Sequence, residues 1–400
     1  MINCADLLVI LIANKVEIYM SKLDDLINKL CPDGVEYKTL REVAIIKNGK
    51  DYKHLTAGDI PVYGSGGIMT YVDTYAYDKP TVLIPRKGSL NNLFYVDVPF
   101  WNVDTIFYTE IDVQQIEPKF LYYFLAKEHL EDLNKAGGVP SLTQSILNKL
   151  VVPVPPLEIQ NEIVQILDKF TELEAELEAE LEARRKQYEY YRDSLLTFGD
   201  DVEWKTIGDI TEVFSAKRVY REQWQNEGVP FWRSSDLISF YNGVENSRGK
   251  AYISKELYES LAAISGKIMK DDILITGGGT IGIPYIVPSN DPLYVKDGDL
   301  LCIQHNKSLD SKFLYHYFLS GQFRKYLSEI THDATIAHYT IIQIKNTPVP
   351  IPPMETQIKI ATVLDRFEFL CNDITSGLPA EIEARHKQYE YYRDKLLAFK

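Results

Sequence analysis

Lysine and arginine side chains occur in two separate groups of polar segments, and both groups are interleaved with aromatic residues. In a DNA groove, Arg and Lys pair with guanine, whereas Asn and Gln pair with adenine. A single such side chain is more often a solvated surface charge, but the two sets together predict two surfaces that bind nucleic acid. The first set is Lys47, Lys50, Lys53, Arg86 and Lys87 with Tyr63, Trp101, Asn91 and Asn92; the second is Lys217, Arg218, Arg221, Arg233 and Lys296 with Trp224 and Trp232.

A short polar motif allows two interpretations. Ser141, Thr143 and Gln144 are small polar residues in a predicted loop before a strand. They suit contacts with base edges or phosphates, but Ser and Thr also cap helices routinely. The sequence leaves both interpretations open.

Motifs for catalysis and metal binding are weak. Gly277, Gly279 and Gly282 satisfy GxGxxG, but residues 283–286 predict a strand where a dinucleotide site needs a helix. The sequence contains no GxxxxGK[ST] and no NPPY or DPPY tetrapeptide. The four cysteines and seven histidines show no metal-ligand or disulfide spacing, which also fits a reducing cytoplasm. We therefore predict no catalytic residue, no metal site and no cofactor in this chain.

The acidic excess of the chain is concentrated in one segment. The 400 residues contain 43 basic and 57 acidic side chains, a net charge of −14. Residues 151–202 hold 13 acidic and 5 basic side chains, a net of −8, with alternating glutamates from Glu172 to Glu182. This run is most simply the solvated face of a helix. The other segments are near neutral, so the total charge does not exclude phosphate binding there.

The sequence repeats itself. EARRKQYEYYRDSLLTF at 182–198 and EARHKQYEYYRDKLLAF at 383–399 are identical at 14 of 17 positions. Residues 153–170 also match residues 350–367, whereas the segments that precede these matches diverge. One scaffold is therefore present twice with different surface chemistry, which predicts two related sites that read different targets.

Hydrophobic periodicity predicts an α+β fold for each divergent block. Short β-branched and aromatic runs between Gly, Pro and Asn predict strands, and a longer amphipathic segment in each block predicts one helix. The strands are expected at 81–84, 93–98, 272–276 and 285–287, and the helices at 117–133 and 311–330.

Two long helices are predicted after the blocks. From Leu157 to Phe198 there is no Pro or Gly, and apolar residues recur at a spacing near 3.5, which is typical of a coiled coil. The second helix, residues 354–399, contains Gly377 and Pro379, so we expect a kink or two parts there. We predict that the two long helices form an antiparallel coiled coil that relates the blocks by a pseudo-twofold axis.

Five segments are predicted from these patterns. They are an N-terminal lead and short helix at 1–34, a first recognition domain at 35–152, a central long helix at 153–200, a second recognition domain at 201–349 and a C-terminal helix at 350–400. The apolar stretch at 7–13 is too short for a membrane span, which needs about 20 residues. We expect a cytoplasmic protein.

The order of these segments resembles the specificity subunit of type I restriction–modification systems. Both divergent blocks are followed by VPxPPLExQ-like and KQYEYYRDxLL-like segments, and the resemblance extends from Met20 to Lys400. It implies a non-catalytic subunit whose two target recognition domains each read one half of a split double-stranded DNA sequence. Two modification subunits, and also restriction subunits, would be partners, and these would use S-adenosylmethionine, ATP and Mg²⁺. The alternative is a protein-interaction adaptor with duplicated binding domains.

The resemblance and the residue chemistry together extend the two candidate surfaces. The loops at 63–67, 86–92 and 141–144 are expected to read one half-site, and those at 218–221, 233–235 and 276–280 the other. This adds Ser65, Ser89, Ser234, Ser235, Thr276, Gly278 and Thr280 to the candidate DNA-binding residues. By resemblance, the repeated helices would contact modification subunits through Gln160, Gln357, Tyr188, Tyr191, Tyr389 and Tyr392.

Overall fold

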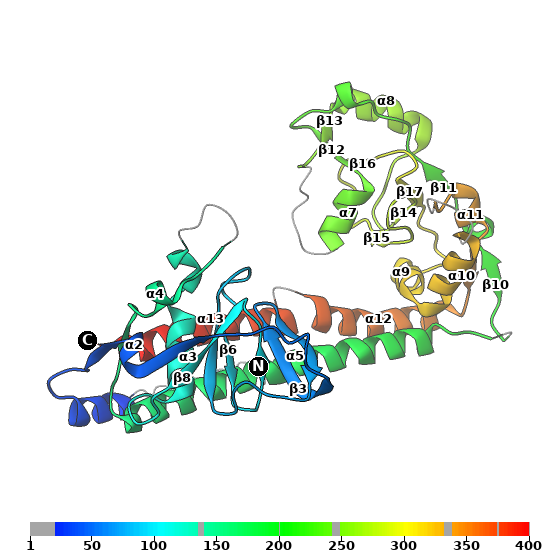
Figure 1. The fold of residues 1–400 in the computed structure, drawn as a ribbon. Helices are drawn as coiled ribbons and strands as arrows, with labels where there is room; N and C mark the ends of the chain where they lie inside the picture. The colour runs from blue at the N-terminus through cyan, green and yellow to red at the C-terminus, as the bar shows by residue number, and fades with distance from the viewer. Residues whose placement is uncertain are drawn as a thin grey trace. The chain divides into compact units, whose positions relative to one another are not determined.

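A computed structural model describes residues 21–134, 140–199, 201–241, 249–331, 338–373 and 376–399. The chain divides into two compact units (Figure 1): unit 1 comprises residues 1–178 and 382–400, and unit 2 comprises residues 179–381. Residues 21–30 form the predicted short helix, while the lead at 1–19 lies outside the described residues. None of the helices in the described ranges combines the length and apolarity needed to cross a bilayer.

Unit 1 contains three small sheets. A two-stranded sheet pairs β1 (Tyr37–Thr39) with β9 (Val151–Pro153). The main sheet is antiparallel and has the order β2-β8-β5-β6, and a third sheet has the order β4-β3-β7 with β3 and β7 parallel. Every residue of β5 is buried, and the hydroxyl of its one polar residue, Thr81, donates to Thr109 O at 2.6 Å. The strands are β2 (Ala44–Asn48), β3 (Ala57–Gly64), β4 (Gly67–Val72), β5 (Thr81–Pro85), β6 (Phe94–Val96), β7 (Trp101–Asn102) and β8 (Ile106–Ile111).

Unit 2 repeats this topology strand for strand. Its sheets have the orders β10-β18, β11-β17-β14-β15 and β13-β12-β16, and β12 and β16 are again the parallel pair. The internal repeat predicted from the helices therefore extends through the divergent blocks. The strands are β10 (Trp204–Thr206), β11 (Val213–Ser215), β12 (Val229–Trp232), β13 (Tyr252–Ile253), β14 (Ile273–Thr276), β15 (Pro284–Ile286), β16 (Tyr294–Val295), β17 (Leu300–Ile303) and β18 (Pro348–Pro350).

Short helices connect these strands. Unit 1 contains α2 (Leu40–Val43) and α4 (Gln144–Leu147). Unit 2 contains α6 (Ile207–Ile210), the 3₁₀ turn η2 (Arg221–Gln223), α7 (Ser234–Tyr241), α8 (Lys255–Ser265) and α11 (Ile341–Lys345).

The prediction of one amphipathic helix per block was wrong in its extent. Residues 117–133 form α3 (Pro118–Lys127) and a 3₁₀ turn η1 (Leu130–Leu133), because His129 between them adopts φ 44°. Residues 311–330 divide into α9 (Ser311–Leu319) and α10 (Gly321–Thr331) at Ser320. Ser320 is extended, and its hydroxyl accepts a hydrogen bond from Phe323 N at 3.3 Å. The apolar pattern continues through both breaks because the segments on either side face the same core.

The long helices have the predicted form. α5 (Leu157–Leu195) is a single helix of 39 residues, whereas the second stretch divides into α12 (Met354–Asn372) and α13 (Leu378–Leu396), as Gly377 and Pro379 predict. In unit 1, α5 packs antiparallel to α13, with the Phe170 and Tyr392 rings stacked at 5.4 Å. In unit 2, α5 packs against α12, with Tyr191 and Phe367 stacked at 5.5 Å. These two stacked pairs occupy equivalent positions of the sequence repeat, so the antiparallel pairing is built twice.

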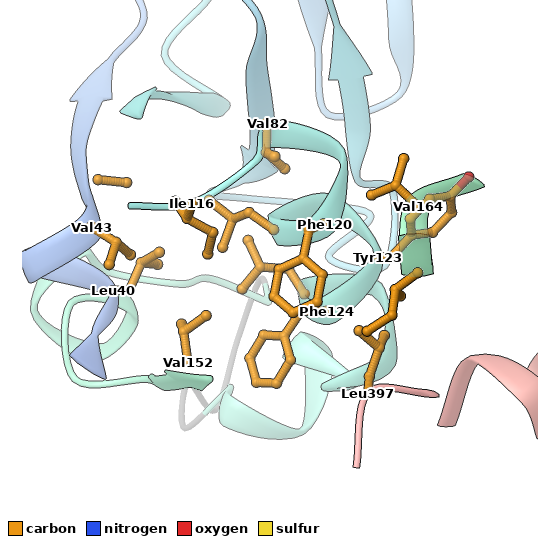
Figure 2. Packing of buried hydrophobic residues seen from close by; sticks show 14 of the residues in the cluster. Leu40, Val43, Val82, Ile116, Phe120, Tyr123, Phe124, Val152, Val164 and Leu397 are labelled. Carbon is orange, nitrogen blue, oxygen red and sulfur yellow. The ribbon is translucent and has the colours of Figure 1, made fainter. Parts of the chain in front are cut away.

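The core of unit 1 joins its main sheet to the helices. Figure 2 shows Val82 of β5, Phe120 and Phe124 of α3, and Leu397 from the end of the chain in one buried cluster. A hydrogen bond also ties the segment that follows α13 to β1, since the Tyr37 hydroxyl donates to Phe399 O at 2.9 Å. The sheet of each recognition block is thus fixed to the helices through α3 or, in unit 2, through α9, which packs on α12.

Candidate nucleic-acid interface

Many of the candidate residues lie in loops at equivalent edges of the two main sheets. In unit 1, β2 and β5 both run antiparallel to β8, so their carboxyl ends lie beside the start of β8. In unit 2, β11 and β14 end in the same way beside the start of β17. The loops that follow these strands carry Lys50, Lys53, Arg86 and Lys87 in one unit, and Lys217, Arg218, Gly278 and Thr280 in the other.

Thr105 connects two of the predicted loops in unit 1. Its carbonyl oxygen accepts hydrogen bonds from Arg86 N at 2.9 Å and Lys87 N at 3.2 Å. Its hydroxyl accepts one from Ser65 N at 3.3 Å, and the Asn92 side-chain amide donates to Ser65 O at 3.0 Å. The loops at 63–67 and 86–92 therefore form one continuous surface.

The third predicted loop joins the same surface. Lys87 and Ser141 form an isolated antiparallel bridge, and Leu142 N donates to Arg86 O at 2.9 Å. The Thr143 hydroxyl accepts from Ile146 N at 3.3 Å and so caps α4, which begins at Gln144. The capping interpretation of this motif is thus confirmed for Thr143. The exposed candidates on this side are Lys50, Lys53, Lys87, Ser89, Asn91 and Thr143.

Other candidates in unit 1 are held from within the unit. Lys47 lies on β2 and forms an ion pair with Glu110 at 3.2 Å. The Arg86 guanidinium donates to Asp104 O at 3.3 Å and lies 5.8 Å from the centre of the Phe107 ring. Tyr63 packs edge-on against Phe100, and burial raises the pKa of its hydroxyl. Lys47 and Tyr63 are therefore placed to support the loops from within the unit.

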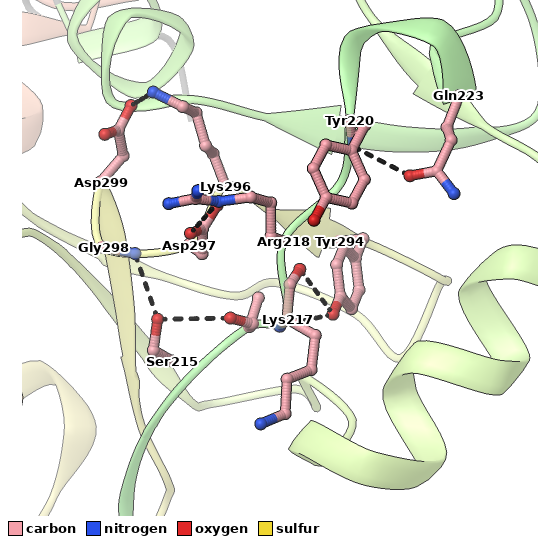
Figure 3. Close-up of polar contacts among 11 residues, drawn as sticks. Ser215, Lys217, Arg218, Tyr220, Gln223, Tyr294, Lys296, Asp297, Gly298 and Asp299 are labelled. Carbon is pink, nitrogen blue, oxygen red and sulfur yellow. Dashed lines mark hydrogen bonds and ion pairs between the residues drawn. The ribbon is translucent and has the colours of Figure 1, made fainter.

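In unit 2, basic side chains are paired with aspartates (Figure 3). Arg218 Nε donates to Asp297 at 3.1 Å, and Lys296 Nζ donates to Asp299 at 2.9 Å. The Tyr294 hydroxyl accepts from Lys217 N at 2.8 Å and ties this loop to β16. Exposed ion pairs contribute only about 0–1 kcal/mol, so a phosphate can replace the aspartate as partner at little cost.

Arg233 differs from the other candidates because it is buried. Only 7% of it is exposed, and it donates two hydrogen bonds to Asp236, at 2.6 and 2.8 Å, and one to Gly249 O at 2.6 Å. The hydrogen bond to Asp236 raises the pKa of the guanidinium. Arg233 therefore fixes the start of α7, where Ser234 and Ser235 lie. Arg221, by contrast, is exposed in η2.

The glycine-rich segment of unit 2 is a tight turn. Thr276 is fully buried, and its hydroxyl donates to Thr280 O at 2.6 Å and accepts from Ile283 N at 2.8 Å. The next element is β15, as predicted from the sequence, and not the helix of a dinucleotide site. Gly278 is buried and Thr280 is exposed, so Thr280 is the side chain that the turn presents outward.

Two side chains that organise these surfaces were missed from the sequence. Thr105 and Tyr294 each link segments that are far apart along the chain, and neither belongs to a recognisable motif. Phe240 was also missed; it is largely exposed and packs beside Trp232 at 6.2 Å. A repeat alignment could have indicated Tyr294, since it lies on the strand that matches β7.

The two repeated units correspond to two copies of one known domain. The model of the type I restriction modification DNA specificity domain matches residues 32–183 and 199–384, which is most of the chain. The chain belongs to the type I restriction–modification specificity family. It carries two specificity domains in tandem, each with one of the loop surfaces described above.

Relatives of this type I specificity chain extend over nearly its whole length. A putative type I restriction enzyme specificity subunit of Haemophilus influenzae is 33% identical over 383 residues, covering 91% of this chain and 96% of the relative. The specificity subunit of EcoR124I/EcoR124II from Escherichia coli is 31% identical over 402 residues, covering 92% and 95%. The crystal structure of the Mycoplasma genitalium S subunit has the same fold, with a TM-score of 0.56, 17% identity and coverage of 91% and 96%.

Two residues predicted to contact modification subunits lie inside this type I specificity chain. Gln160 is fully buried; its amide oxygen accepts from Glu117 N at 2.8 Å, and its amide nitrogen donates to Gln115 O and Pro155 O at 2.9 and 2.7 Å. Gln357, 1% exposed, makes the equivalent bonds to Asp310 N, Ser308 O and Pro352 O. Each glutamine fastens the start of a short helix, α3 or α9, to the long helix on which the glutamine lies.

The predicted tyrosines divide into buried and exposed positions. Tyr188 is buried, and Tyr389 and Tyr392 are partly buried in the packing between helices. Tyr191 stacks on Phe367 and is 39% exposed. The most exposed aromatic residues of the repeated motif are Tyr190 and Tyr391, at 69% and 61%. Each directly precedes one of the predicted tyrosines in the sequence, Tyr191 or Tyr392.

Proposed function

We propose that this specificity subunit reads a bipartite double-stranded DNA target, one half with each unit. One observation carries the proposal: the same sheet edge occurs twice, and each copy presents a different set of basic and polar side chains. The first half-site would be contacted by Lys50, Lys53, Lys87, Ser89 and Asn91, and the second by Lys217, Arg218, Arg221, Thr280 and Lys296. Lys and Arg supply phosphate contacts and guanine contacts, and Asn supplies adenine contacts.

In the proposed mechanism, other residues hold these DNA-contacting side chains in place. Arg233, Thr276 and Thr143 hold the backbone of their loops, and Thr105 and Tyr294 join one loop to the next. Because each loop is held by hydrogen bonds before DNA arrives, less conformational entropy is lost on binding. The divergent loops then differ in the base pairs that they select, while the shared scaffold stays the same.

The chain is proposed to act without catalysis of its own. The sequence lacks a phosphate-binding loop and an amino-methyltransferase tetrapeptide, so S-adenosylmethionine, ATP and Mg²⁺ are assigned to modification and restriction subunits. The exposed Tyr190 and Tyr391 occupy equivalent repeat positions, which supports two like docking surfaces for two modification subunits. The proposed domain boundaries are those predicted from the sequence, with recognition domains at 35–152 and 201–349.

An exchange of one recognition domain tests the proposal. Residues 203–347 are replaced by the corresponding block of another family member, and the methylated motif is mapped in a host that carries the modification partner. One half-site should change while the other and the distance between them remain. If both halves change, the two units are not independent readers.

The adaptor alternative predicts a different result in a simpler assay. A DNA-reading chain, assembled with its modification partner, binds duplex DNA with an affinity that falls steeply with salt. An adaptor would show no such salt-dependent DNA binding.

A further inference from the structure

Three side chains that can bind a metal converge in unit 2. His316 lies on α9, and Asp365 and Glu368 lie three residues apart on one face of α12. One ligand atom from each lies within 4.8 Å of the others, and His316 Nε2 is 2.9 Å from Asp365 Oδ1. We propose that these three residues bind a divalent ion of the zinc class, which clips the recognition domain of unit 2 to its long helix. This site does not depend on the proposed DNA reading.

The ligands are oriented by neighbouring side chains. His316 is fully buried, and its Nδ1 lies 3.2 Å from the Tyr188 hydroxyl, so Nε2 is directed at the carboxylates. Metal-bound histidines usually have such a partner on the second ring nitrogen. The Tyr315 hydroxyl donates to one oxygen of Glu368 at 2.6 Å, which leaves the other carboxylate oxygen for an ion.

The local charges favour a cation at this position. Asp365 and Glu368 place two carboxylates beside one another, and like charges at this range repel. Lys312 Nζ donates to Asp365 Oδ2 at 2.6 Å, while Asp365 Oδ1 faces His316. Arg192, a further cation near Glu368, is paired with Asp193 at 3.0 Å. A divalent ion would neutralise both carboxylates, and it can enter from solvent because the Asp365 side chain is 31% exposed.

The internal repeat provides the same structure with only one of the three proposed ligands. In unit 1, the residues equivalent to Lys312, His316, Asp365 and Glu368 are Lys119, Tyr123, Asp168 and Thr171. The lysine–aspartate pair is kept at 2.7 Å, but the Tyr123 hydroxyl now donates to Asp168 at 2.7 Å. Unit 1 therefore satisfies its single carboxylate with a hydroxyl. Both differences in unit 2, His for Tyr and Glu for Thr, add a metal ligand beside the same aspartate.

The donor set defines the class of ion. One imidazole nitrogen and two carboxylate oxygens, with water at the open position, suit Zn²⁺ or Co²⁺. Mg²⁺ and Ca²⁺ prefer oxygen ligands alone. The sequence search for close Cys and His spacings could not find this site, because its ligands are 49 and 52 residues from His316.

Zinc binding to the full chain tests the site. The purified protein is treated with a chelator, dialysed, and titrated with ZnCl₂ by calorimetry and with CoCl₂ by visible absorption. One ion per chain is expected, with a rise in Tm that grows with zinc concentration. The variants His316→Tyr and Glu368→Thr, which restore the residues of unit 1, should each weaken binding by at least about 100-fold, and Tyr188→Phe by about 10-fold. The variant His386→Tyr removes a histidine that lies 2.8 Å from Glu174 elsewhere in the chain, and it should bind zinc normally.

Two results would overturn the proposal. One is the absence of zinc binding to the native chain at millimolar concentration. The other is native zinc affinity in folded His316→Tyr and Glu368→Thr proteins, with folding checked by circular dichroism of the metal-free forms. If the buried His316 variant does not fold, the partly exposed Glu368 variant decides the question, because its loss of binding supports the site and its normal binding refutes it.

Discussion

Replacing Gln160 by leucine separates a structural role of this residue from a role in binding partners. The side chain is fully buried and makes three hydrogen bonds to backbone groups at 2.7 to 2.9 Å. Leucine has a similar volume, so it fills the space but leaves Glu117 N, Gln115 O and Pro155 O without a partner. Each buried group left unsatisfied costs about 1–3 kcal/mol.

The expected loss for Gln160→Leu is about 4 kcal/mol of unfolding free energy, since some of these groups regain water at the rim of the helix. For a unit of this size, 1 kcal/mol lowers Tm by about 2–4 °C, so Tm should fall by about 10 °C. Gln357→Leu should have a similar effect on unit 2. Gln165→Leu, on an exposed position of α5, is the control and should change the free energy of unfolding by less than about 0.5 kcal/mol.

The assay is thermal and urea unfolding, combined with a pull-down of the modification subunit. Unchanged stability together with lost assembly would refute the structural role and establish Gln160 as a partner contact. Lost stability with assembly retained at low temperature is the result that the buried geometry requires.

Three further perturbations address the loops and the helices. Arg233→Ala should destabilise unit 2 by about 3 kcal/mol, because it removes the guanidinium that pairs with the largely covered Asp236 carboxylate; thermal unfolding measures this, and a loss of DNA affinity at full stability would contradict it. Lys87→Ala should weaken DNA binding about equally on all sequences and lower the salt slope by about 1, whereas a change confined to one base pair would make Lys87 a base-reading residue. Inserting one more Leu-Glu-Ala-Glu after Glu180 lengthens α5 by about 6 Å, so the methylated motif should keep both half-sites and gain one to two base pairs of spacer; an unchanged spacer would refute a measuring role for the helix.

Much of the architecture could be predicted because the same sequence pattern occurs twice in the chain. The matched KQYEYYRD segments predicted the repeat, and the spacing of apolar residues in α5 predicted the antiparallel pairing that Phe170–Tyr392 and Tyr191–Phe367 realise. Gly377 and Pro379 predicted the division into α12 and α13. Local backbone chemistry of this kind acts over a few residues, so it can be read directly from the chain.

Contacts between distant segments could not be predicted in this way. Arg233 was chosen as a ligand-binding residue from its charge, but its partners Asp236 and Gly249 bury it within the fold. Gln160 and its repeat equivalent Gln357 were expected by resemblance to contact partners, but both belong to a repeated internal clamp. The breaks at His129 and Ser320 were hidden because apolar periodicity records which face is buried and not whether the helix is continuous.

Mapping methylated bases in a host that carries this chain with its modification partner tests the central claim most directly. Two separate loop surfaces on one repeated scaffold predict a motif of two specified parts divided by a spacer of fixed length and free sequence. A single uninterrupted motif, or methylation without sequence preference, would contradict the account.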